Sequence, residues 1–66
     1  MTQDRFLRIR EVLTITGLSR ASLYVMVKND LFPAPVRLGA RSVAWRASQV
    51  REWMDTRPEA TQANWK

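Results

Sequence analysis

The stretch GLSRASLYVMVK, residues 17–28, decides how this chain is expected to fold. Gly17 can adopt a positive φ and end one helix, and Ser19 is suited to cap the N-terminus of the next. Apolar side chains then recur at helical spacing, at Leu23, Met26, Val27 and, one turn on, Leu31. The stretch therefore predicts the turn and second helix of a helix-turn-helix.

The opposite side of this predicted helix carries small, polar and basic side chains. Ala21 lies near its start and Lys28 near its end, with Val25 between them. Such a surface can approach a DNA groove closely without burying an unpaired charge. We therefore hypothesise that this helix binds double-stranded DNA selectively, in the major groove.

Composition limits the alternatives. The chain has 66 residues, enough for one domain with a small core. No apolar run is long enough to cross a membrane, and residues 1–15 mix charged with apolar side chains instead of forming a signal segment. With no cysteine and no histidine, a disulfide framework and the usual zinc sites are excluded. We expect a cytoplasmic protein with no cofactor, no metal and no membrane contact.

Positive charge is concentrated in the middle of the chain. The net charge is +5, from 11 basic and 6 acidic side chains. Residues 19–46 carry five basic side chains against Asp30 alone, or +4. A basic segment of this kind is typical of a nucleic-acid partner, although a solvated basic face without a partner is the alternative.

The chain before the central stretch predicts one short helix. Residues 1–5 are expected to be flexible, and Phe6 with Leu7 to form a short extended entry. A helix is then predicted over about residues 9–16, followed by a second over 19–30, with Leu18 filling the corner between them. The prolines at 33 and 35 hold the following segment extended, and Phe32 is expected to pack back on the core.

Two short strands are predicted after this segment, at residues 36–38 and 43–45, joined by the four-residue loop 39–42. Alternation places apolar residues on one face of each strand, so this face is expected to lie on the helices. Arg37, Arg41 and Ser42 then fall on the free face and tip, as in a DNA-binding wing. The alternative is a structural hairpin with solvated arginines.

A third helix is predicted over about residues 47–56, with Val50, Trp53 and Met54 as its buried stripe. Pro58 ends it. Residues 58–66 show no periodicity and are expected to form a flexible tail, in which Trp65 either folds back on the domain or meets a partner. The expected folded domain is residues 6–57, mainly α with a small β-hairpin.

In four segments the chain resembles the AlpA-type prophage regulators, within the MerR-like and excisionase-like group: residues 6–12, 16–24, 32–39 and 43–53. The resemblance covers residues 6–57 and implies a winged helix-turn-helix. It implies a transcription regulator of phage or mobile-element origin, or a relative that bends attachment-site DNA to direct excision by an integrase.

The candidate DNA-binding residues lie on the second helix and the hairpin: Ser19, Arg20, Ala21, Ser22, Tyr24, Val25, Lys28, Arg37, Arg41, Ser42 and Arg46. Arg20 is expected to reach a guanine edge or a phosphate. Val25 could contact a thymine methyl group. Tyr24 could place its hydroxyl against the DNA backbone or its ring against a thymine methyl, or it could be half-buried. Arg41 is the candidate for the minor groove or flanking phosphates, with Arg37 and Arg46 beside it.

We do not expect an enzyme, because catalysis without histidine or cysteine would need carboxylates or lysine, and the six acidic residues are scattered. Three functions compete: a transcription regulator, an excision factor, and a protein-interaction module that inhibits another regulator. A monomer is expected in free solution. Tight selective binding would need a second copy on DNA or a partner such as an integrase.

Overall fold

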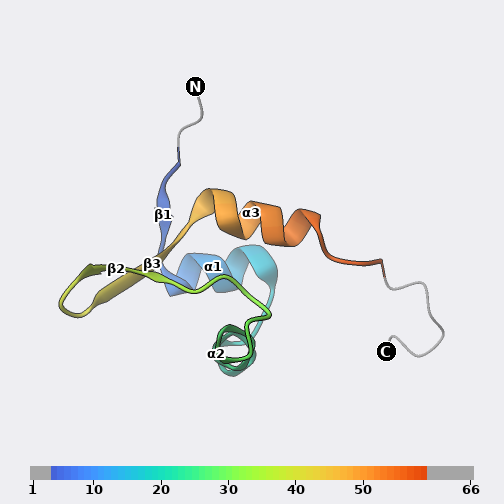
Figure 1. The fold of residues 1–66 in the computed structure, drawn as a ribbon, viewed down its shortest axis with the longest axis horizontal. Helices are drawn as coiled ribbons and strands as arrows, with labels where there is room; N and C mark the ends of the chain where they lie inside the picture. The colour runs from blue at the N-terminus through green and yellow to red at the C-terminus, as the bar shows by residue number, and fades with distance from the viewer. Residues whose placement is uncertain (1–3, 60–66) are drawn as a thin grey trace.

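Three helices and a three-stranded antiparallel sheet make up the computed structural model, which describes residues 4–59 (Figure 1). The elements in chain order are β1 (Phe6–Leu7), α1 (Ile9–Thr16), α2 (Arg20–Lys28), β2 (Val36–Gly39), β3 (Ser42–Arg46) and α3 (Ala47–Asp55). The expectations for residues 1–3 and for the tail from residue 60, including Trp65, lie outside the described residues.

The turn between α1 and α2 follows the sequence prediction. Gly17 has φ +77° and donates its backbone N–H to the Leu13 carbonyl at 2.8 Å, which ends α1. The Ser19 hydroxyl accepts a hydrogen bond from the Ser22 N–H at 3.1 Å, which starts α2. Leu18 is half-buried against the core between the two helices. The predicted corner is therefore confirmed.

The predicted end of α2 at Asp30 is wrong by two residues. The helix ends at Lys28, and Asp30 adopts a left-handed conformation with φ +60°. The Leu31 N–H then bonds to the Met26 carbonyl and the Asp30 N–H to the Val27 carbonyl, the pattern of a Schellman cap. Because this turn redirects the chain, Leu31 is 57% exposed and does not extend the apolar stripe.

Two tryptophans fix the segment that joins α2 to β2. Trp45 donates its indole N–H to the Pro33 carbonyl at 2.7 Å, and Trp53 donates to the Leu31 carbonyl at 2.8 Å. Phe32 is buried against both rings, with centroid distances of 6.5 Å to Trp45 and 4.6 Å to Trp53. The prediction that Phe32 packs on the core is confirmed, and the segment holds α2 and the hairpin in one arrangement.

The sheet has one strand more than predicted. Its order is β1-β3-β2, and β1 pairs antiparallel with β3, so that Leu7 lies opposite Trp45. The hairpin strands are also longer than predicted, because Gly39 pairs with Ser42 and leaves a two-residue turn at Ala40 and Arg41. The prediction of a two-stranded sheet with a four-residue loop was therefore wrong. Residues 6–7, which were expected to form only an extended entry, are the third strand of the sheet.

The register of the hairpin also corrects the prediction of its faces. Arg37 lies opposite Val43, and Val36 lies opposite Ala44, with a register shift between Arg37 and Gly39. Directly opposite residues share a face, so Arg37 lies on the same face as Val43, and Val36 on the other. The outer half of the hairpin projects away from the helices (Figure 1), and Val43 is accordingly 43% exposed.

The core is small and draws on every element except β2. Its buried members are Leu7, Val12, Leu23, Phe32, Trp45 and Val50, with partly buried apolar side chains packed around them. Trp53 is half-buried as expected, but Met54 is 39% exposed, so its placement in the buried stripe was wrong. Helix α3 ends one residue earlier than predicted, with Thr56 as its C-cap.

The residues just before β1 are attached to α3. Asp4 accepts hydrogen bonds from the Ser48 backbone N–H at 2.9 Å and from the Ser48 hydroxyl at 2.7 Å. The Ala47 N–H bonds to the Arg5 carbonyl at 2.8 Å, and Arg5 forms an ion pair with Glu11 at 3.3 Å. Asp4 therefore caps the N-terminus of α3, although the sequence placed it in a flexible end.

We expect Asp4→Ala to lower the Tm by a few degrees at neutral pH. The hydrogen bonds from Ser48, side chain first and backbone second, hold the pKa of Asp4 below its ordinary 3.8. A carboxyl group whose pKa is lower in the folded state stabilises the fold at pH values above its unfolded-state pKa. This stability is lost as the pH falls through the folded-state pKa. Thermal unfolding measured from pH 7 to pH 2 should show the Tm values of the parent and the variant converging at low pH. Glu52→Ala, an exposed substitution on α3, should leave the Tm nearly unchanged. A Tm difference between Asp4→Ala and the parent that stays constant at all pH values would contradict the capping role of Asp4.

Candidate nucleic-acid interface

Helix α2 turns one side into the core and the other to solvent. Leu23 is fully buried and Met26 and Val27 are half-buried, which fixes the orientation of the helix. All six candidate residues within α2 are exposed: Arg20, Ala21, Ser22, Tyr24, Val25 and Lys28. Tyr24 is 54% exposed, so about half of its surface is accessible to a partner. In Figure 1 this helix is seen end-on, whereas α1 and α3 run across the view.

Ser19 and Ser22 are engaged with each other at the start of α2. The Ser19 hydroxyl donates to the Ser22 hydroxyl at 2.9 Å and accepts from the Ser22 N–H. Both side chains are exposed, so they lie at the surface beside Arg20. Capping of the helix accounts for the geometry of this pair in the free protein.

The turn of the hairpin presents Arg41 to solvent. Arg41 is exposed between the two strands, and Ser42, the first residue of β3, is half-buried. Arg37 donates from its Nη1 to the Ala40 carbonyl at 3.2 Å, across the turn. The structure thus brings Arg37, Arg41 and Ser42 together at the outer end of the hairpin.

Arg46 lies apart from this group. It is the last residue of β3, opposite Phe6 in the sheet, and its guanidinium lies 6.0 Å from the centre of the Phe6 ring. Its charge also contributes to the lowered pKa of Asp4. Arg46 is exposed, but its described contacts are with the N-terminal strand and not with the hairpin turn.

The basic side chains of the central segment form no ion pair within residues 4–59. The single ion pair in this part of the chain joins Arg5 to Glu11. Arg20, Lys28 and Arg41 therefore present uncompensated charge to solvent, along with Arg37, whereas the charge of Arg46 interacts with Asp4. Exposure alone does not distinguish these residues, because four basic residues that were not selected from the sequence are also exposed without such a pair: Arg8, Arg10, Arg51 and Arg57.

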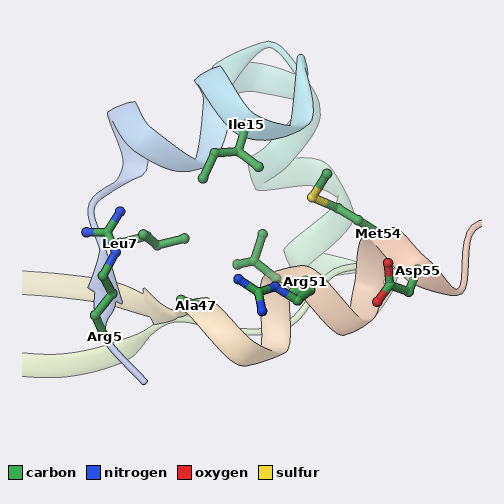
Figure 2. A pocket seen from close by; sticks show the side chains of 8 residues that line it. Arg5, Leu7, Ile15, Ala47, Arg51, Met54 and Asp55 are labelled. Atoms are coloured by element: carbon green, nitrogen blue, oxygen red, sulfur yellow. The ribbon is translucent and has the colours of Figure 1, made fainter. Parts of the chain in front are cut away.

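A pocket lies elsewhere, between α1, β1 and α3. It has a volume of about 260 Å³. In Figure 2, Ile15 and Met54 point into this space from the two helices, and Leu7 lines its wall. None of the eleven candidate DNA-binding residues lines it, whereas Arg46 lines a separate pocket with Asp4, Arg5 and Phe6. Within residues 4–59, no helix has the length and apolar character needed to span a membrane.

A small helix-and-sheet domain with an exposed basic surface is typical of a nucleic-acid-binding protein, and the comparisons with known proteins point to the same class. The chain matches the family described as prophage CP4-57 regulatory protein (AlpA) over residues 5–58. It belongs to this family, and the resemblance found from the sequence is confirmed.

Two relatives support the assignment. The uncharacterized protein ORF88 of Enterobacteria phage P4 is 46% identical over 54 residues, which cover 82% of this chain and 61% of that protein. This chain thus spans about three fifths of the length of the phage relative. The DNA-binding transcriptional activator AlpA of Escherichia coli K12 is 32% identical over 59 residues, covering 80% of this chain and 84% of that protein. No solved structure matches the chain.

Proposed function

We propose that this chain is a sequence-selective, double-stranded DNA-binding regulator of transcription from a prophage or related mobile element. Helix α2 enters the major groove, and the β2–β3 hairpin acts as a wing on the flanking minor groove or phosphates. The domain is then a winged helix-turn-helix. The observation that carries the proposal is the exposed side of α2, where Arg20 and Lys28 have no acidic partner within residues 4–59.

The charge distribution supports this proposal. Cations that make no ion pair within the protein are available to replace the counterions around DNA phosphates. Arg20 at the start of α2 and Arg41 in the hairpin turn lie on two different elements, so a single duplex could be held at two points. The E. coli relative, named a DNA-binding transcriptional activator, adds weight to a role in transcription.

The proposed partner is DNA, and the protein is proposed to be a monomer in free solution. A module of 66 residues makes few base contacts, so we propose that a second copy or an integrase adds affinity on the DNA. Excision control and inhibition of another regulator are the alternatives that the experiment must separate.

Selection of bound sequences from a random duplex library tests the function. We expect a short motif to be enriched, and to occur beside a promoter near the gene for this protein. Clusters of the motif at an integrase attachment site would favour an excision factor instead. Failure to enrich any sequence, together with no salt-dependent affinity for duplex DNA, would contradict DNA binding and favour the protein-interaction module.

A further inference from the structure

We propose that Val25 contacts the methyl group of a thymine, so that the preferred DNA site carries a thymine under the middle of α2. The proposal rests on the proposed function and specifies what the helix recognises. It concerns one side chain and one chemical group, and both can be altered independently.

Val25 lies at the centre of the solvent-facing side of α2. At 3.6 residues per turn, Ala21 and Asn29 lie one turn on either side of it, and Ser22 and Lys28 flank it. All of these residues are exposed, whereas Leu23 on the opposite side is fully buried. A groove that receives this side of the helix therefore meets Val25 first.

The exposure of Val25 is not explained by the stability of the helix. Its side chain is 56% exposed, so it adds little to the core. A β-branched residue also has a lower helix propensity than the straight-chain residues that suit an exposed helical position. An exposed valine here gains its free energy of burial when a ligand covers it.

The neighbouring charges indicate what kind of ligand covers Val25. Arg20 and Lys28 are eight residues apart, which separates them by about 12 Å along the helix axis. A ligand that fits this surface carries anionic groups near both ends and an apolar group between them. In the DNA major groove the thymine methyl is the apolar group that the base edges offer, and phosphates border the groove.

Ala21 makes close approach possible. Ala21, one turn before Val25, is small and exposed, so the helix backbone can approach the bases at this point. Tyr24 is also 54% exposed, but consecutive residues of a helix point about 100° apart, so it lies toward the edge of this surface. The geometry thus favours van der Waals recognition at the centre of α2 over hydrogen-bonded readout.

Single replacement of each thymine in the selected duplex by deoxyuridine tests the proposal. Uracil keeps the base pair and removes the 5-methyl group. For the parent protein we expect one central position where this change weakens binding about fourfold, the effect of removing one buried methyl group. Val25→Ala should bind the thymine duplex more weakly by a similar factor and should no longer distinguish thymine from uracil there.

Matched variants separate this contact from a general effect on the protein. Val25→Thr keeps the shape of the side chain and one of its two methyl groups, so it should retain only part of the discrimination. Asn29→Ala, at the edge of the same surface, should keep it. Tm values of all variants should match the parent within a few degrees, since both positions are exposed.

Three outcomes would contradict the proposal, and they differ in what they mean for the proposed function. A parent protein that binds the selected duplex tightly but is indifferent to uracil at every position overturns the role of Val25 and leaves the proposed function intact. Discrimination that survives in Val25→Ala has the same meaning. Absence of binding to any duplex overturns the proposed function itself.

Discussion

Replacing both Arg20 and Arg41 by alanine is expected to weaken DNA binding by a factor on the order of ten or more, with the Tm nearly unchanged. Both residues are exposed and form no ion pair within residues 4–59, so their loss costs the free protein little. If each binds one phosphate, the slope of log affinity against log salt should become shallower by about two. Fluorescence anisotropy across a salt series measures both quantities.

Arg51→Ala provides the matched control for charge. Arg51 is also exposed without an ion pair in the described region, but it lies on α3 and lines the pocket between α1, β1 and α3. Its replacement should change the affinity much less than either of the other two substitutions. Parent-like binding by the Arg20→Ala, Arg41→Ala double variant at every salt concentration would contradict the proposed interface and bring the protein-interaction module to the front.

Trp45→Ala should leave the protein largely unfolded at 25 °C. Trp45 is 1% exposed, contacts Phe32 and donates a hydrogen bond to the Pro33 carbonyl. Truncation of a buried tryptophan costs about 3–5 kcal/mol. The single core of a 66-residue domain supplies only about 3–5 kcal/mol, so this loss removes most of its stability. Circular dichroism during thermal and urea unfolding measures the loss.

Trp45→Phe separates packing from hydrogen bonding at the same position. The phenyl ring keeps most of the apolar burial, but the Pro33 carbonyl loses its donor, so we expect a smaller loss of about 1–3 kcal/mol. Since this segment joins α2 to the hairpin, the Phe variant should remain folded and bind DNA somewhat more weakly. A Trp45→Ala protein that unfolds within a few degrees of the parent would show that this tryptophan does not hold the core.

The parts of the fold that could be predicted are those with local signals. Gly17 and Ser19 fixed the turn between α1 and α2, because a positive φ and a cap each involve residues only a few positions apart. Helix α1 has the predicted bounds for the same reason. The early end of α2 is also local, but Asp30 in a left-handed conformation carries no strong sequence signal, as glycine would have done.

The parts that were missed depend on distant contacts. Strand β1 has two residues, and its partner β3 lies almost forty positions further along the chain. The Asp4 cap links two residues 44 positions apart, and no sequence pattern near Asp4 indicates that Ser48 donates the hydrogen bond. Arg37 was placed on the wrong face because the register of the hairpin depends on the length of its turn.

The exposed side of α2 was predicted correctly, but the position of Arg46 was not. The side of α2 that faces solvent follows from helical periodicity, so the exposure of Ala21, Val25 and Lys28 was expected. The position of Arg46 beside Phe6 was not, because it requires the unpredicted pairing of β1 with β3. Which bases the surface contacts depends on the DNA as well as on the protein, and only binding experiments give that.

We propose above all that α2 and the hairpin turn contact the same DNA duplex at the same time. Site-directed DNA cleavage is the direct test of this arrangement. The chain has no cysteine, so Asn29→Cys and Ala40→Cys each provide a unique attachment point for an iron chelate, one beside the outer side of α2 and one in the turn. On the selected duplex, we expect localised cleavage by both conjugates within the same site, at its interior from residue 29 and at its flank from residue 40. Cleavage from residue 29 alone, or unlocalised cleavage from residue 40, would contradict it.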